Sequence, residues 1–142
     1  MIGADTTFLV QLELREVPEH AAAHALLQRE ILLPGVPLGL APQVLAEFIH
    51  VVTDPRRFQA PLSMEVALAK ARFWWQAAEV RPILPTVEAT ALALDWLERH
   101  RLGRKRILDT QLAALLWCHG VRSVITANAA DFRQFGFTVI TP

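Results

Sequence analysis

Short extended segments alternate with longer stretches of helical periodicity along the whole chain, and this alternation limits the folds available to the sequence. The extended segments are the first residues up to Ala4, then 38–41, 80–84, 123–126 and 137–140. The helical patterns between them cover 43–52, 63–78, 86 to about 103, and 108–119. Strands that alternate with helices predict an α/β fold with a parallel sheet covered by helices on both faces. Ligands of such sheets bind at the carboxyl ends of the strands, where the strand order reverses, so we look for site residues there.

Residues that favour helix ends support these helical segments. Pro42 is suited to the first turn of a helix, because its missing N–H has no partner there in any case. Ser63 can cap the next helix through its hydroxyl group. Gly120 can take the left-handed conformation that ends many helices, and Asn128 can cap a short helix after the fourth strand.

Length and composition indicate one compact domain over residues 1–142. The chain is 53% hydrophobic and 20% charged, which is enough apolar material for a substantial core. No apolar run approaches the roughly 20 residues that span a bilayer, and the N-terminus does not resemble a signal peptide. Cys118 is the single cysteine, which excludes an internal disulfide and a cysteine zinc cluster. We therefore expect a cytoplasmic protein with no membrane segment.

The formal net charge of +0 means that no overall basic field attracts the chain to nucleic acid. This argues against a simple electrostatic nucleic-acid binder. It does not argue against a metal-dependent nuclease, because divalent cations held by acidic residues bring positive charge to the site itself.

Two acidic residues in the first half of the chain are candidates for such a site. Asp5 directly follows the first predicted strand and precedes a helical run, a position that an ordinary helix cap would also explain. Glu47 has Val44 and Val51 as its helical neighbours and Phe48 beside it. A carboxylate on such an apolar stripe costs several kcal/mol if it is unpaired, so we favour a functional role for Glu47.

Two further acidic residues lie in the second half. Asp109 opens the helical segment ILDTQLAALLWCHG, and Asp131 lies in ITANAADF, just beyond the fourth predicted strand. A helix cap again explains Asp109 alone, and the helix dipole alone would favour Asp131 in a first turn. If all four carboxylates converge, however, they need a counter-charge. Oxygen-only ligands select Mg²⁺ or Mn²⁺, and ions of this kind can activate water for phosphodiester hydrolysis.

The chain resembles the PIN-domain family, and within it the VapC-type toxins of type II toxin–antitoxin systems. The segments that carry the resemblance are ADTTFLV, LAPQVLAEF, ILDTQLAAL and GVRSVITANAADF, which contain the four acidic residues in the family's order. The resemblance covers nearly the whole chain. It implies a three-layer α/β/α sandwich, Mg²⁺- or Mn²⁺-dependent RNA cleavage, a homodimer, and inhibition by a small antitoxin protein.

Transferred to this sequence, the resemblance gives Asp5, Glu47, Asp109 and Asp131 as the catalytic and metal-binding residues. Thr6, Thr126 and Asn128 are the expected supporting polar residues. Asn128 occupies the position that holds an acidic residue in some members, so Asn128 and Asp131 are alternatives for the fourth site residue.

Basic and aromatic residues offer further candidates. Arg104, Lys105 and Arg106 precede Asp109, and they could contact RNA phosphates or simply form a solvated loop. The four tryptophans lie on apolar helical stripes, which favours the core or a subunit interface over base stacking. The apolar surface around Phe73, Trp74 and Trp75 is the sequence feature that favours a homodimer.

Other α/β enzymes fit the sequence less well. A haloacid-dehalogenase-like phosphatase needs a second Asp two residues after Asp5, where Thr7 stands. A receiver domain needs an acidic residue in the third strand, and RPILP has none. No glycine-rich nucleotide-binding motif occurs. A PIN fold that binds without catalysis is the remaining alternative, and the presence of all four acidic residues argues against it.

Overall fold

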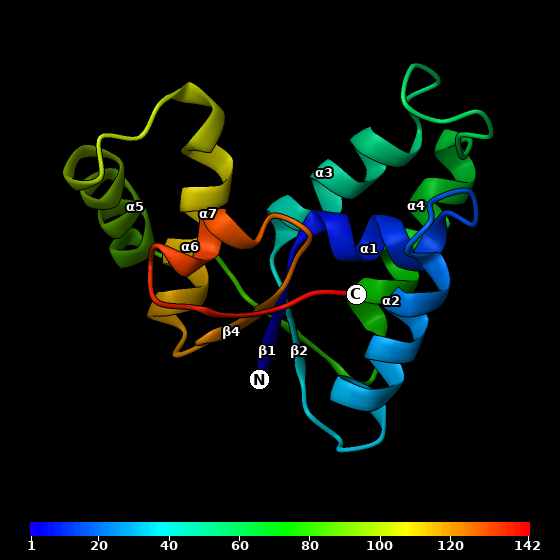
Figure 1. Cartoon of the computed structure of the whole chain (residues 1–142), viewed down its shortest axis with the longest axis horizontal. Coiled ribbons are helices and arrows are strands. Elements are labelled where there is room, and N and C mark those ends of the chain that lie inside the picture. The colour runs from blue at the N-terminus through cyan, green and yellow to red at the C-terminus, as the bar shows by residue number, and fades with distance from the viewer.

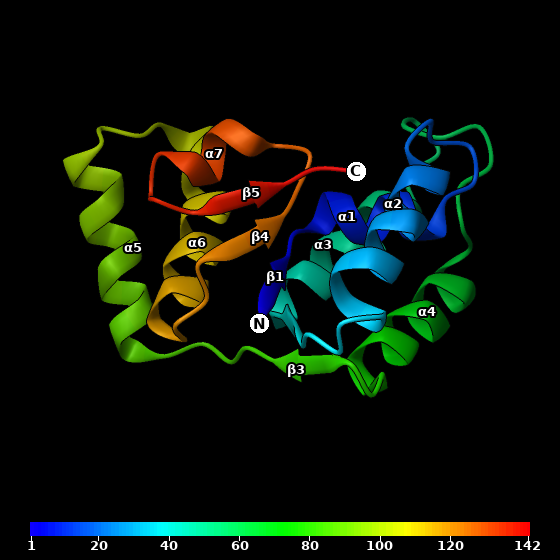
Figure 2. The same cartoon turned by 60° about the horizontal axis from the view of Figure 1, so that its bottom comes forward.

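A computed structural model describes all 142 residues and has a five-stranded parallel sheet at its centre (Figures 1 and 2). The order across the sheet is β3-β2-β1-β4-β5, and every neighbouring pair is parallel. The strands are β1 (Ile2–Ala4), β2 (Leu38–Leu40), β3 (Val80–Pro82), β4 (Ser123–Ile125) and β5 (Thr138–Ile140). All five predicted strands are present, each up to two residues shorter than expected. The predicted α/β fold with a parallel sheet is confirmed.

Helices cover both faces of this sheet. The first group contains α1 (Thr6–Glu13), α2 (His20–Leu27), which continues into a π-helical turn (Gln28–Leu32), α3 (Pro42–Val52) and α4 (Met64–Gln76). The second contains α5 (Val87–Arg99), a 3₁₀ turn (Arg104–Arg106), α6 (Ile107–Cys118) and α7 (Ala129–Arg133). In both views the two groups lie on opposite sides of the strands, which gives a three-layer α/β/α arrangement.

The core is continuous and has its largest fully buried side chains at Phe8, Phe48 and Phe132, which come from α1, α3 and α7. Gly3 in β1 allows α6 to approach the sheet closely. A Cβ atom at this position would lie 2.7 Å from a methyl carbon of Leu116, so any larger residue would push α6 outward. This packing holds α6, and with it Asp109, against the strand that ends at Asp5.

Two helical regions differ from the sequence-based prediction. The fifth helix ends at Arg99 rather than near Gly103, because the chain turns through Arg101, which adopts the left-handed conformation with φ 51°. The helix α2 was missed by the sequence analysis. Its sequence HAAAHALL is rich in alanine, which is found on buried and exposed faces alike, so the segment lacks a clear apolar stripe. Gly120 does end α6, with φ 77°.

The strand order places the reversal point between β1 and β4. Successive strands β1, β2 and β3 extend to one side, and β4 and β5 extend to the other. The backbone N–H of Asp5 donates to the carbonyl oxygen of Ile125 at 3.1 Å, which ties the carboxyl ends of β1 and β4 together. No helix of the protein is both long enough and apolar enough to span a bilayer.

Candidate active site

Asp5 lies at the carboxyl end of β1 and also caps α1. Its Oδ1 accepts the backbone N–H of Thr6 at 2.7 Å, so the simple helix-cap interpretation is correct as far as it goes. Its Oδ2 accepts the hydroxyl groups of Thr126 at 2.6 Å and Thr7 at 3.1 Å. One backbone N–H and two hydroxyl groups therefore fix the orientation of this carboxylate. These donors follow the ends of β1 and β4, and they are more than a helix cap requires.

The Asp5 side chain is almost fully buried, with 2% of its surface exposed. Burial raises the pKa of its carboxyl group, and the negative charge of Asp131 raises it further. The hydrogen bonds from Thr126, Thr6 and Thr7 partly offset these effects because they stabilise the ionised form. The ionised carboxylate of Asp5 is thus buried, and uncharged hydrogen-bond donors hold it in place.

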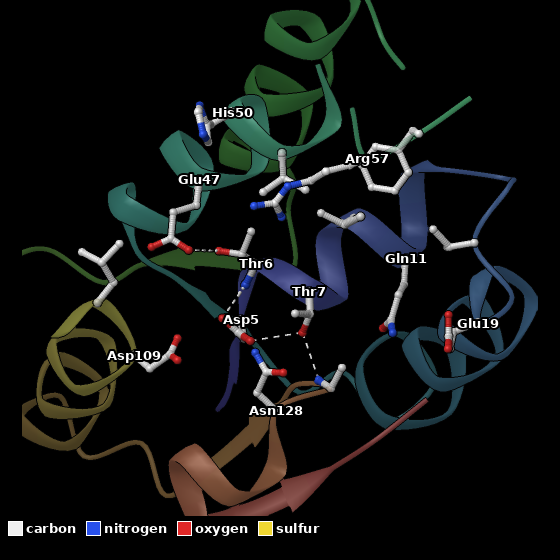
Figure 3. A pocket seen from close by; sticks show the side chains of 16 residues that line it. Asp5, Thr6, Thr7, Gln11, Glu19, Glu47, His50, Arg57, Asp109 and Asn128 are labelled. Atoms are coloured by element: carbon white, nitrogen blue, oxygen red, sulfur yellow. Dashed lines mark hydrogen bonds between the residues drawn. The ribbon is translucent and has the colours of Figure 1, made fainter. Parts of the chain in front are cut away.

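Glu47 reaches the same place from α3. Its Oε2 accepts the hydroxyl of Thr6 at 2.9 Å, so Thr6 and its neighbour Asp5 join α3 to the start of α1 (Figure 3). Val44 and Phe48 are fully buried beside Glu47, as the apolar stripe in the sequence predicts. Burial raises the pKa of Glu47, and the charge of Asp5 adds to the effect.

Asp109 lies in the first turn of α6 and does not cap it, since Arg106 occupies the cap position. Its pKa is raised from 3.8 to about 7. The largest cause is burial, followed by the charge of Asp5, a hydrogen bond with Asp131, and the charges of Asp131 and Glu47. All four predicted acidic residues therefore influence one another. On the other side of Asp109, Gln43 of α3 donates to the carbonyl oxygen of Leu108 at 3.1 Å.

Asp131 differs from the other three, because a cation already neutralises it. Arg106 Nη2 lies 3.1 Å from Asp131 Oδ1, and the same guanidinium donates to the Asp131 carbonyl oxygen at 3.2 Å. Arg106 therefore faces the acidic cluster, whereas Arg104 and Lys105 are exposed. The three basic residues do not form one surface.

A pocket of about 510 Å³ opens over these carboxylates. Asp5, Glu47, Asp109 and Asn128 line it, and Figure 3 shows their side chains around the same space. Asp131 does not line it. The predicted supporting residues are placed as follows: Thr6 bonds to Glu47, Thr126 bonds to Asp5, and the backbone N–H of Asn128 donates to Thr126 Oγ1 at 2.9 Å.

Several residues of the pocket were not among the predicted site residues. Thr7 links Asp5 to the loop after β4, since its hydroxyl also accepts the backbone N–H of Ala127 at 2.9 Å. A hydroxyl two residues after a candidate acidic residue, at the start of a helix, was the available signal. Gln11 and His50 also line the pocket, and each lies one helical turn from a site residue.

The donor set consists only of oxygen atoms, which suits Mg²⁺ or Mn²⁺. As they stand, no three His, Cys, Asp or Glu side chains are positioned to hold an ion together. Burial, and to a lesser extent the charges of neighbouring carboxylates, nevertheless raises the pKa of Asp5, Glu47 and Asp109, so a counter-charge would stabilise their ionised forms. A divalent cation is the kind of group that would supply it.

The chain is similar along nearly its whole length to curated VapC ribonucleases. It is 30% identical over 137 residues to Ribonuclease VapC48 of Mycobacterium tuberculosis, which covers 92% of this chain and 89% of that protein. The chain belongs to the VapC ribonuclease family. It is also 29% identical to Ribonuclease VapC24 of the same species, over 97% of this chain and 93% of that one. A scan against protein-family models gave no match.

Solved structures agree with the fold of this VapC-family chain. VapC20 of M. tuberculosis, described as a sarcin-ricin loop cleaving toxin, superposes with a TM-score of 0.76 at 22% identity and full coverage of both chains. VapBC2 from Rickettsia felis, solved with a DNA fragment from its promoter, gives a TM-score of 0.68 at 17% identity, covering 99% of this chain and 98% of that one. At these identities the likeness supports the PIN-like architecture alone.

Proposed function

We propose that this VapC-family chain is a metal-dependent endoribonuclease and the toxin of a type II toxin–antitoxin pair. The observation that carries the proposal is the convergence of Asp5, Glu47 and Asp109 on one pocket at the point where the strand order reverses. Burial raises the pKa of all three carboxyl groups and the charges of neighbouring carboxylates add to it, a pattern that is common at functional sites. The ribonuclease names of the full-length relatives support RNA as the substrate.

Asp5, Glu47 and Asp109 are the residues that would hold Mg²⁺ or Mn²⁺, with Asp131 as the fourth candidate. When bound, the ion would lower the pKa of a water molecule and stabilise charge on the phosphate oxygens. Arg106 contacts Oδ1 of Asp131, so Asp131 could take part through its other carboxylate oxygen or by changing this contact. Asn128 lines the pocket without such a pair, so both alternatives for the fourth residue stay open.

The chain's own residues have separate roles in this proposal. Thr126 and Thr7 fix the Asp5 carboxylate, and Thr6 fixes Glu47, so neither has to be ordered when substrate binds. In the metal-free chain Asp109, with its pKa of about 7, can hold a proton near neutral pH, and it would release that proton when the ion binds. Arg57 lines the far side of the pocket and is suited to contact a phosphate.

The likeness to VapC proteins also suggests which proteins this chain binds. The neighbour VapBC2 was solved with a DNA fragment from its promoter, and this likeness supports our proposal of a small antitoxin that covers this chain. We also propose a homodimer. Of the residues that suggested a dimer surface, Trp74 is buried in the core with 4% exposure. Phe73 is 62% exposed, so it and the half-buried Trp75 are the residues left to form an interface.

The proposed function is tested by cleavage of a mixed RNA pool with and without divalent ions. We expect the purified chain to cleave in Mg²⁺ or Mn²⁺, to stop in excess chelator, and to recover when the metal is restored. Cleavage that continues in chelator would refute the metal mechanism. No cleavage under any condition, with tight binding to an antitoxin, would favour the non-catalytic PIN module.

The basic residues are expected to act on RNA affinity rather than on chemistry. Replacing Arg104 and Lys105 together by Ala should reduce the slope of log affinity against log salt by up to about two, because each phosphate contact contributes nearly one. Filter binding in chelator measures this slope without cleavage. Arg29→Ala is the matched control, since Arg29 is exposed and lies outside the pocket. An unchanged slope in the double variant would show that this loop is only solvated.

A further inference from the structure

Gln11 is a polar residue of the active-site pocket that the mechanism above does not use. It lies on α1, lines the pocket, and has 7% of its surface exposed. Its amide oxygen is buried and has no hydrogen-bond partner in the protein. Buried polar groups are nearly always paired, so an unpaired amide at the wall of a pocket needs an explanation.

The polar side chains that α1 contributes nearer its N-terminus are paired. Thr6 bonds to Glu47, and Thr7 bonds to both Asp5 and the backbone of Ala127. Gln11 follows Thr7 by four residues, so the two lie on the same helical face, about 6 Å apart along the axis. Gln11 thus lies on the helix face whose threonines bond to the carboxylates, but its own amide oxygen bonds to no residue of the chain.

Figure 3 shows how Gln11 lies relative to the carboxylates. Asp109, Asp5, Thr7 and Gln11 follow one another across the pocket, with Glu19 beyond. Gln11 is therefore on the side of Asp5 away from Asp109. Val10, Val51 and Phe58 line the pocket as well, so it combines apolar surface with the unpaired amide of Gln11 and a few charged or polar side chains. Binding sites for small organic groups, which include nucleobases, have this composition.

We propose that Gln11 determines specificity by binding the edge of an RNA nucleobase next to the cleaved bond. The inference rests on the proposed function, since it requires RNA in the pocket. A carboxamide carries an acceptor and two donors, and each nucleobase edge presents neighbouring donor and acceptor groups. Sequence-specific proteins read such edges in unpaired RNA, where the bases are free to turn outward. The apolar side chains would contact the faces of the same base.

If Gln11 served only to stabilise the fold, its replacement by an apolar residue would lower the stability, but its unpaired amide predicts the reverse. A buried amide oxygen without a partner destabilises the fold, and an apolar side chain of similar shape removes that cost. Gln11→Met should therefore be at least as stable as the parent. The presence of Gln at this position is explained if the amide bonds to substrate, because polar residues of active sites often lower stability while they serve the activity.

The test compares cleavage-site preferences of the full chain and its variants on RNA with randomised nucleotides, in Mn²⁺. The 5′ and 3′ ends of the products are sequenced, and melting temperatures are measured in parallel. For Gln11→Met we expect a preference at one position beside the cleaved bond to weaken about 10-fold, with RNA still cleaved and the melting temperature unchanged or higher. Gln111→Met, at an exposed glutamine of α6, is the matched control and should keep the parent's preferences.

Gln11→Glu is a second test of the proposal, because it keeps the shape and the acceptors of the side chain but loses the amide donors. It should change which base is preferred at the same position. Unchanged preferences in both active Gln11 variants would overturn the inference and leave the proposed function standing. Absence of cleavage by the parent would instead overturn the proposed function, and the inference with it.

Discussion

Asp109→Asn is expected to lower the rate of RNA cleavage by at least about 100-fold while stabilising the metal-free protein. The loss of activity follows because the variant removes one of the three carboxylates that line the pocket and would hold the ion. The gain in stability follows because burial and the charges of Asp5, Asp131 and Glu47 disfavour the ionised form of Asp109, and amide replacement removes this charge at nearly constant shape. Cleavage rates in Mn²⁺ and melting temperatures in chelator measure the two effects.

Asp95→Asn provides the matched control for Asp109→Asn. Asp95 lies on α5, half exposed, and pairs only with Arg99 at 2.9 Å. An exposed pair of this kind contributes little, so the control should leave both cleavage and melting temperature nearly unchanged. Added Mn²⁺ should raise the melting temperature of the parent and of Asp95→Asn, but much less that of Asp109→Asn. If Asp109→Asn kept full activity, Asp109 would have no place in the catalytic site.

Asp5→Asn should also abolish cleavage, but its effect on stability is expected to differ. Asp5 caps α1 and accepts hydroxyl groups from Thr7 and Thr126. Both hydroxyls bond to Oδ2, whereas the Thr6 N–H bonds to Oδ1, so the single amide oxygen of Asn can keep either the two hydroxyl bonds or the helix cap, but not all three. We therefore expect a loss of about 1–2 kcal/mol in the free energy of unfolding that offsets the relief of charge repulsion. Urea unfolding of the two Asn variants in chelator would separate them.

The sequence was sufficient to predict the sheet and to single out acidic residues that the fold brings to one pocket, for a physical reason. Buried parallel strands and amphipathic helices have distinct periodicities, so the five strands and the helices α3, α4 and α6 could be located within a few residues. Acidic residues at the ends of β1 and on α3 stood out because their neighbours are apolar. Residues such as Asp5 and Glu47 conflict with their surroundings, and such conflicts are common at functional sites.

Other features depend on contacts between distant segments, which local patterns do not reveal. The pairing of Arg106 with Asp131 joins the turn before α6 to α7, 25 residues later, and nothing in the basic run distinguishes Arg106 from Lys105. The missing partner of the Gln11 amide is likewise visible only once the helix is packed. The helix α2 was missed because its stability depends on burying Ala23, Leu26 and Leu27 against the rest of the fold.

The stability of the metal-free protein is expected to fall as pH rises from 5 to 8. The pKa of Asp109 is about 7 in the folded chain and near 3.8 when unfolded, so between these values the folded state binds more protons. This contribution to stability is fully present below about pH 4 and is lost as pH rises through about 7. The raised pKa values of Asp5 and Glu47 act in the same direction. Since Asp109 is only half-buried, we expect a decrease of about 1–2 kcal/mol, less than the full shift implies.

Urea unfolding in chelator at several pH values measures this decrease, and Asp109→Asn isolates its cause. The variant differs from the parent only at this carboxyl group. Subtracting the two stability profiles leaves the part due to Asp109, which should lie between about pH 4 and 7. Saturating Mn²⁺ should reverse the trend in the parent, because ionised carboxylates bind the cation and protonated ones do not. Parallel profiles for parent and variant would mean that Asp109 is ionised throughout this range, and that the carboxylates do not repel one another as the structure indicates.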